Sequence, residues 1–304
     1  MIDTGMLDSV LAAAALLWTP LALAAIGGLV NRVGGIVNIG LEGQMLIGAL
    51  IGAVVSGATG SWALAVLAAA VAGTLGGLAM SLCITRLRAN QIIAGLGFNI
   101  VVAGLVGYLL DSVFDVSATL RVDGLEPLPE LDIPVIDDLP VVGAVVSGRD
   151  PLFWLAVLCV PAMSIWLRHT RAGLRLRATG SETDTAASLG LSVPWIRDRS
   201  GMVAGLAAGI AGAHLSLGQV GLFNQDMVAG RGFIALAAFY FGRSRPLPTA
   251  LACVLFAVFD ATQARLQIAG IATQLVQTLP YVVVMVVLTG AGIRGARARN
   301  RRTG

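Results

Sequence analysis

Few side chains in this 304-residue chain have the types or the spacing that catalysis requires. All 20 basic residues are arginines, so the lysine of a phosphate-binding P-loop and the lysine of Schiff-base chemistry are both missing. The two histidines, His169 and His214, are far apart in the sequence, which does not fit a zinc site or a His-based triad. The three cysteines stand singly in apolar stretches, which predicts buried thiols rather than a disulfide framework.

The stronger candidates are polar residues inside apolar runs. Glu42 is the one acidic residue well inside the first four such runs, and Asn38, four residues earlier, would share a helix face with it. Both lie in the glycine-rich stretch 34–44. The pair could line a substrate path, brace a broken helix, or form a satisfied polar contact between two helices. Weaker candidates for lining a path are Asn99, Asp260 and Gln263.

The apolar runs themselves predict an all-α, polytopic membrane protein. Hydrophobic residues make up 57% of the chain and charged residues 12%, against roughly 45–50% and about 25% in soluble domains. The mean hydropathy is +0.85. We expect about nine transmembrane helices, with the seventh too short to be an ordinary span. They are 10–30, 36–57, 62–84, 91–111, 152–168, 200–218, 232–242, 246–264 and 274–290.

The arginines predict the orientation, because basic loops stay in the cytoplasm. With the N-terminus outside, 16 of the 20 arginines fall on the cytoplasmic side, including a basic C-terminal tail at 291–304. The proline-containing segment 112–150 is then an acidic extracytoplasmic loop. The arginines lie between apolar runs and aromatics are only 6%, so nucleic acid is not an expected partner.

The loop 169–199, on the same side as most arginines, is expected to carry a short helix over about 182–189. Ser181 followed by Asp184 matches a capping-box start, and Gly190 suits a left-handed helix stop. Small side chains on this helix would fit a groove on a partner, although an ordinary amphipathic surface helix is the alternative. The residues expected to contact that partner are Ser181, Glu182, Asp184, Ala186, Ala187 and Gly190.

Glycines in the sixth apolar run have a spacing typical of close helix packing. Gly201, Gly205 and Gly209 form a GxxxGxxxG pattern, which lets helix backbones approach each other in lipid. The pattern predicts packing inside the chain, with a subunit interface as the alternative.

Several of these motifs together resemble a known family. The run 34–49 (GGIVNIGLEGQMLIGA) resembles the permeases of bacterial ABC importers in the branched-chain amino acid, ribose and nucleoside group, closest to the short nucleoside and simple-sugar subgroup. The segments 173–180, 227–238 and 279–281 are similar to other stretches of these permeases. Relatives commonly place a proline early in the coupling helix, where this chain has Thr183.

The resemblance implies that residues 1–304 form one transmembrane permease domain in the bacterial plasma membrane, without catalytic activity or a cofactor of its own. The loop 169–199 would couple to ATPase subunits, which would use ATP and magnesium. Other implied partners are a substrate-binding lipoprotein and either a longer permease paralogue or a second copy of this chain. This chain looks like the shorter paralogue that lacks an extra N-terminal helix.

The resemblance also implies a transport activity. Nucleosides, or else simple sugars, would move inward by alternating access. A secondary transporter of a small polar solute is the alternative, with Glu42 and Asp260 as its candidate ion-coupling carboxylates.

Overall fold

The computed structural model describes residues 4–131 and 147–268. It is a bundle of helices with one small strand pair, which confirms the all-α, polytopic class. The first half contains helices α1 (Thr4–Val33), α2 (Leu41–Thr59), α3 (Trp62–Thr85), α4 (Gln91–Ser112) and strand β1 (Thr119–Leu120). The next helices are α6 (Pro151–His169), α7 (Arg171–Ser181), α8 (Thr183–Ser188) and α9 (Val193–His214). The rest comprises the π-helical turn η1 (Leu215–Val220), strand β2 (Phe223–Asn224), α10 (Arg231–Phe241) and α11 (Pro246–Ile268).

Seven helices in the described part of the chain are long and apolar enough to cross a membrane. They correspond to seven of the nine predicted spans, and the predicted short span 232–242 is the 11-residue helix α10. The predicted span 274–290 and the basic tail 291–304 lie outside the described residues, as does 132–146 of the acidic loop. Large apolar side chains on the outer faces of α3 and α4 are exposed, among them Leu67 and Ile100, as expected of surfaces that face lipid.

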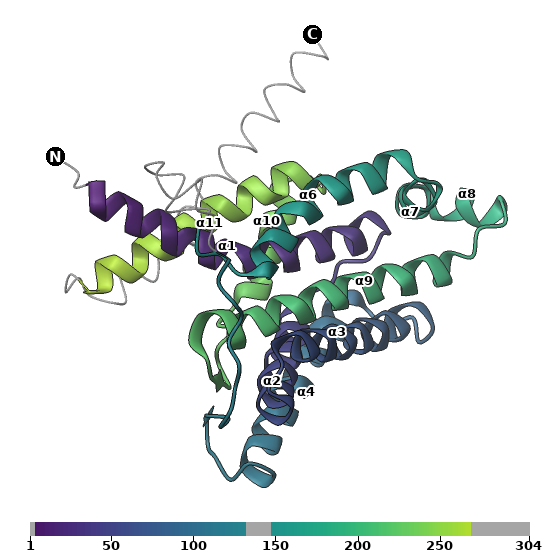
Figure 1. The fold of residues 1–304 in the computed structure, drawn as a ribbon. Coiled ribbons are helices and arrows are strands. Elements are labelled where there is room, and N and C mark those ends of the chain that lie inside the picture. The colour runs from purple at the N-terminus through teal and green to yellow at the C-terminus, as the bar shows by residue number, and fades with distance from the viewer. Residues whose placement is uncertain (1–3, 132–146, 269–304) are drawn as a thin grey trace.

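Helix α9 lies between two groups of helices (Figure 1). On one side it contacts α1, which in turn packs against α6, α10 and α11, and on the other it contacts α2 and α3. At one end of the bundle β1 pairs with β2, and Thr119 faces Asn224. Helices α7 and α8 lie at the opposite end (Figure 1). The loops after α4 and after η1 therefore lie together, far from the loop 169–199 that contains α7 and α8.

Side chains fix the starts of the helices that follow loops. Asn90 accepts hydrogen bonds from the backbone of Ile92 and Ile93 at the start of α4. Asp150 does the same for Leu152 and Phe153 at the start of α6, where Pro151 occupies the first turn. These caps satisfy N–H groups that have no partner within the helix.

The glycines of α9 pack against α3 within the chain. A Cβ atom on Gly205 would overlap the carbonyl oxygen of Gly73, and one on Gly201 would lie 2.7 Å from the Cβ of Ser81. Gly209 makes a similar backbone contact with Ala69. The prediction of intrachain packing for the GxxxGxxxG pattern is therefore confirmed.

We predict that Gly205→Ala lowers the free energy of unfolding by about 1–3 kcal/mol, because the added methyl group must push two backbones apart. Gly104→Ala on α4 is the matched control, since no atom lies within 4 Å of its added Cβ. That substitution should stabilise the chain by about 0.5–1 kcal/mol through helix propensity. Thermal unfolding of both variants in detergent checks this, and equal effects at the two positions would contradict the backbone contact.

Candidate functional site

Two interrupted elements meet inside the bundle. Helix α2 begins only at Leu41, after the non-helical segment 34–40, and α10 begins at Arg231, after the loop that follows η1. The far end of α10 lies at the arginine-rich end of the bundle, where Arg32 stacks over Tyr240 at 5.4 Å. Eleven helical residues span about 16 Å, roughly half the thickness of a bilayer core. The first turns of α2 and α10, here called the junction, thus lie near the middle of the membrane.

The segment 34–40 has hydrogen-bond partners on α4. The backbone N–H of Val37 donates to Oε1 of Gln91 at 2.8 Å. Asn99 donates from Nδ2 to the carbonyl of Ile39 at 3.0 Å and accepts at Oδ1 from the N–H of Gly43 at 2.9 Å. Non-helical backbone at membrane depth is tolerated only where its polar groups are satisfied in this way. Asn99 therefore holds both the extended segment and the first turn of α2.

Glu42 caps α10 from the neighbouring helix. Its two carboxylate oxygens accept hydrogen bonds from the N–H groups of Gly230, at 2.7 Å, and Gly232, at 2.8 Å. These N–H groups lie at the positive end of the α10 dipole, where a carboxylate is favourable. A Cβ on Gly232 would lie 2.6 Å from the Cα of Glu42, so glycine is required at this approach. The structure therefore gives Glu42 the role of a brace for a broken helix, and the same residue also lines the cavity described next.

A cavity of about 270 Å³ opens beside the junction. Glu42 and Asn99 line it, as do the polar residues Gln225 and Asp226 from the loop before α10. Ala229 also lines it and has a φ of +49°, a strained conformation for a residue other than glycine. The remaining lining residues are Gly43, Leu46, Ala103, Val228 and Gly230. A small polar solute is the kind of ligand that this surface suits.

The prediction that Asn38 and Glu42 share a helix face was wrong. Gly35 has a φ of +88° and the chain is not helical at Asn38, which precedes the start of α2. Asn38 is fully buried and donates to Oε1 of Gln44 at 3.1 Å, while its own Oδ1 has no hydrogen-bond partner. It does not line the cavity.

The two candidates on α11 also lie outside the cavity lining. Asp260 forms an ion pair with Arg231 at 3.8 Å, and Arg231 donates to the carbonyl of Met227 at 2.8 Å. Asp260 thus faces the start of α10 from the side of α11. Gln263 is half-buried.

The loop 169–199 is more helical than expected. The amphipathic helix α7 was not predicted, and Thr170 caps it by accepting from the N–H of Gly173 at 3.0 Å. The predicted capping box was wrong, because Ser181 ends α7 and α8 has no side-chain cap. Because Ser181 is itself helical, it cannot adopt the non-helical φ and ψ of an N-cap residue. The stop at Gly190 is confirmed by its φ of +82°.

The exposed surface of α8 differs from the predicted one. Ala186 is only 2% exposed and packs inside this chain, so it is not available to a partner. Ser181, Glu182, Asp184, Ala187 and Gly190 are exposed. Leu189, which was not among the predicted contact residues, is 78% exposed. The sequence signal that could have identified it is an isolated leucine next to the predicted helix stop at Gly190, in a loop outside the apolar spans.

Arg197 connects this loop to the segment that leads into the junction. Its Nε donates to the carbonyl of Gly34 at 3.2 Å, and its Nη2 donates to Oγ1 of Thr183 at 3.1 Å. Thr183 donates in turn to the carbonyl of Thr179 at 2.9 Å. One guanidinium therefore joins α8, α9 and the segment 34–40.

A buried acid–histidine pair lies at the opposite end of the bundle and was missed from the sequence. Nε2 of His214, which is fully buried, lies 3.0 Å from Oδ2 of Asp150. Burial alone would raise the pKa of Asp150, but the hydrogen bond and charge of His214 and the N–H groups of Phe153 and Leu152 together lower it. The pair joins the start of α6 to the end of α9, and the separation of 64 residues left no sequence signal.

Comparison with known proteins identifies the kind of chain. Residues 10–288 match the family described as branched-chain amino acid transport system / permease component. No solved structure gives a significant match.

Curated relatives cover nearly the whole chain. A nucleoside ABC transporter permease protein of Lactococcus lactis is 33% identical over 89% of this chain and 88% of its own length. A putative glucose ABC transporter permease protein of Haloferax volcanii is 32% identical over 97% of this chain and 94% of its own. A guanosine ABC transporter permease protein of Bacillus subtilis is 31% identical over 89% of this chain and 88% of its own.

We predict that Glu42→Ala destabilises the folded chain by about 1–3 kcal/mol, because the N–H groups of Gly230 and Gly232 lose their acceptor. Glu42→Gln should have a smaller effect, since the amide keeps one acceptor oxygen but loses the charge that favours the helix end. Asp111→Ala, at an exposed position on α4, is the control. Thermal unfolding in detergent gives the order, and a Glu42→Ala variant as stable as Asp111→Ala would show that the cap contributes nothing.

Proposed function

The chain belongs to this family of transport-system permeases and is the permease subunit of an ABC importer, and we propose that it moves nucleosides inward by alternating access. The observation that carries the mechanism is the set of hydrogen bonds that joins α8, through Arg197, to the segment 34–40 and then, through Asn99, to the junction. A displacement of α8 by a partner would act on the backbone beside the cavity.

The division of labour follows from the residue inventory. The whole sequence lacks the lysine of a P-loop, so separate ATPase subunits would supply the energy. They would bind the exposed side of α8, where Ala187 and Leu189 lie. A substrate-binding lipoprotein would deliver the ligand to the opposite end of the bundle. A longer permease paralogue, or a second copy of this chain, would complete the path.

The position of the arginines supports the orientation that we propose. Arg32, Arg86 and Arg168 stand at the ends of α1, α3 and α6, at the same end of the bundle as α7 and α8. With this end in the cytoplasm, α1 would begin on the outside. The predicted span 274–290, which lies outside the described residues, would then return the chain to the cytoplasmic side.

The chemistry of the cavity supports a polar substrate with several hydrogen-bond donors, because the carboxylates of Glu42 and Asp226 line it together with the amides of Asn99 and Gln225. Gln225 offers an amide. The side chains of Glu42 and Asn99 hydrogen-bond to backbone N–H groups and also line the cavity. Such groups bind the hydroxyl groups of a ribose and the edges of a base. Two of the relatives described above are named for nucleosides or guanosine and one for glucose, so simple sugars are the second class to test.

Uptake in a strain that lacks the chromosomal copy tests the function. We predict that the intact chain restores ATP-dependent accumulation of labelled guanosine or uridine. Labelled ribose or glucose should accumulate poorly in the same cells. Accumulation that persists after ATP depletion but disappears with an ionophore would instead favour a secondary transporter. Restored uptake of sugar and not of nucleoside would reject the proposed substrate.

Two substitutions should separate docking from transmission. We predict that Leu189→Asp lowers the amount of ATPase that copurifies, because it places a charge on the exposed docking surface. Arg197→Gln should keep the ATPase bound but reduce uptake at least about tenfold, since a loss of about 1.4 kcal/mol of coupling has that effect. Leu87→Asp, at a leucine that is 76% exposed in the loop after α3, is the control for a new surface charge. Normal uptake in Arg197→Gln would contradict the proposed connection.

A further inference from the structure

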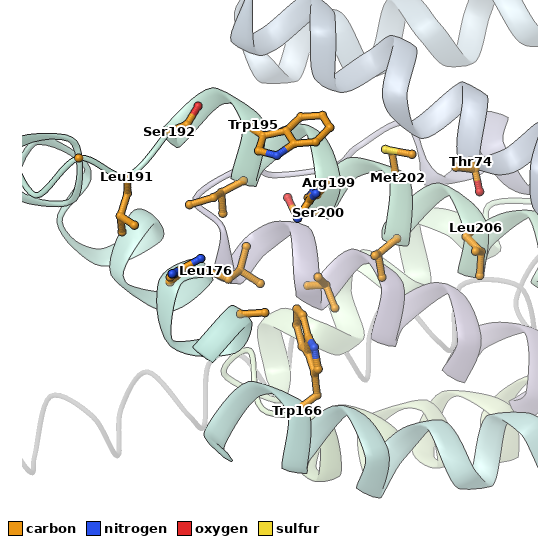
Figure 2. A pocket seen from close by; sticks show the side chains of 16 residues that line it. Thr74, Trp166, Leu176, Leu191, Ser192, Trp195, Arg199, Ser200, Met202 and Leu206 are labelled. Carbon is orange, nitrogen blue, oxygen red and sulfur yellow. The ribbon is translucent and has the colours of Figure 1, made fainter. Parts of the chain in front are cut away.

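A second and larger cavity, of about 690 Å³, lies at the arginine-rich end of the bundle. It is separate from the junction and is lined by residues of α1, α3, α6, α7 and α9. Figure 2 shows Trp166 of α6 and Trp195 of α9 on opposite sides of it. Tryptophans are enriched at the level where the hydrocarbon meets the head groups.

The α9 wall of this cavity is a single stripe. Trp195, Arg199, Met202, Val203 and Leu206 recur at the spacing of one helix face, beside the face whose glycines pack on α3. Trp195 is 49% exposed and Leu206 is 42% exposed, so other helices of the described chain leave this stripe partly uncovered. From Trp195 to Leu206 the stripe extends about 16 Å along the axis.

Polarity changes along the length of the cavity. Ser192 lies toward the loop end of the cavity, whereas Leu206 lies at the other end, near Thr74 of α3 (Figure 2). Arg175 of α7 and Arg199 also line the cavity, and Val203 lies one turn before Leu206 on α9. The hydroxyl of Thr74 is satisfied by the carbonyl of Ala70 at 2.7 Å, so the deep end offers an apolar surface.

The two cations lie at the head-group end. Arg175 and Arg199 are exposed, and within the described chain neither forms an ion pair with a carboxylate. Arg199 stacks over the ring of Trp195 at 4.5 Å, which holds its guanidinium at the mouth of the cavity. A positive mouth above an apolar groove is complementary to an anionic phospholipid whose head group lies at the mouth and whose acyl chain lies in the groove.

We propose that an anionic phospholipid of the cytoplasmic leaflet binds in this cavity, with its phosphate on Arg175 and Arg199 and one acyl chain along the α9 stripe. Basic pockets between transmembrane helices on the cytoplasmic side suit anionic head groups, and that leaflet carries a negative surface potential. The proposal rests on the orientation proposed above. Because the cavity contacts both α7, through Leu176, and the stop of α8 at Gly190, the lipid joins the coupling loop to the membrane helices.

The test is lipid retention by the purified complex of permeases and ATPase. After exchange into detergent with phosphatidylglycerol or phosphatidylcholine, native mass spectrometry counts the lipid that stays bound. The intact complex should retain phosphatidylglycerol, and the double variant Arg175→Gln, Arg199→Gln should retain it roughly thirty-fold more weakly. The matched control is the double variant Arg171→Gln, Arg177→Gln. Both arginines are exposed on α7, the helix that carries Arg175, but they lie outside the cavity lining.

A second variant tests the acyl chain without changing charge. Val203→Trp should fill the deep part of the cavity and reduce retention, whereas Leu67→Trp, on the exposed face of α3, should not. Equal retention of the two lipids, or equal retention by the arginine pair and its control, overturns the proposal. So does a crosslink from Leu206→Cys to another protein chain or to the C-terminal residues of this one, because protein and not lipid would then cover the stripe.

Discussion

Backbone N–H and C=O groups that leave helical geometry inside a bilayer have no water to bind, so the protein must supply a partner for each. Within residues 4–131 and 147–268, helical geometry is interrupted before α2 and again before α10, and the two interruptions lie side by side. At the first break, Gln91 and Asn99 hydrogen-bond to backbone groups of the segment 34–40. At the second, Glu42 accepts from the backbone N–H groups at the start of α10. Because Glu42 belongs to the helix that follows the first break, the two breaks stabilise each other. The cavity exists where they meet.

The opposite requirement governs α9. Its glycine face brings its backbone against that of α3, and such a contact is lost if the helices separate even slightly. Gly209 and Gly212 bring α9 equally close to the backbone of α2, at Gly48 and Met45. We therefore expect the packed parts of α2, α3 and α9 to move as one body. The segment 34–40 and the start of α10 are held by hydrogen bonds to side chains, which can exchange partners over short displacements. A transport cycle that keeps α2, α3 and α9 together and rearranges the segment 34–40, α4 and α10 fits both kinds of contact.

Elements with a strong apolar pattern could be predicted from the sequence, and those set by tertiary contact could not. The seven long helices follow from runs of about 20 apolar residues, and the GxxxGxxxG packing follows from local spacing. The predicted span 36–57 places residues 36–40 in a helix, but the φ of +88° at Gly35 and distant partners at Gln91 and Asn99 hold these residues in a non-helical conformation. Likewise the acceptor role of Glu42 depends on Gly230 and Gly232, nearly 190 residues away. Ala186 could not be assigned to the interior because a six-residue helix has no reliable period.

The choice of arginine for every basic residue has a structural use beyond orientation. Arg197 donates in two directions, to a backbone carbonyl and to a hydroxyl on another helix. Arg231 donates to the carbonyl of Met227 while it pairs with Asp260. Arg86 reaches Asp198, a buried carboxylate that also accepts from Thr85 at 2.7 Å. A planar guanidinium holds several donors in a fixed geometry, whereas an ammonium is a compact charge on a flexible stem. A lysine at position 197 would carry the same charge but would not fix α8 and the segment 34–40 at a set distance, and the coupling that we propose between them depends on that distance.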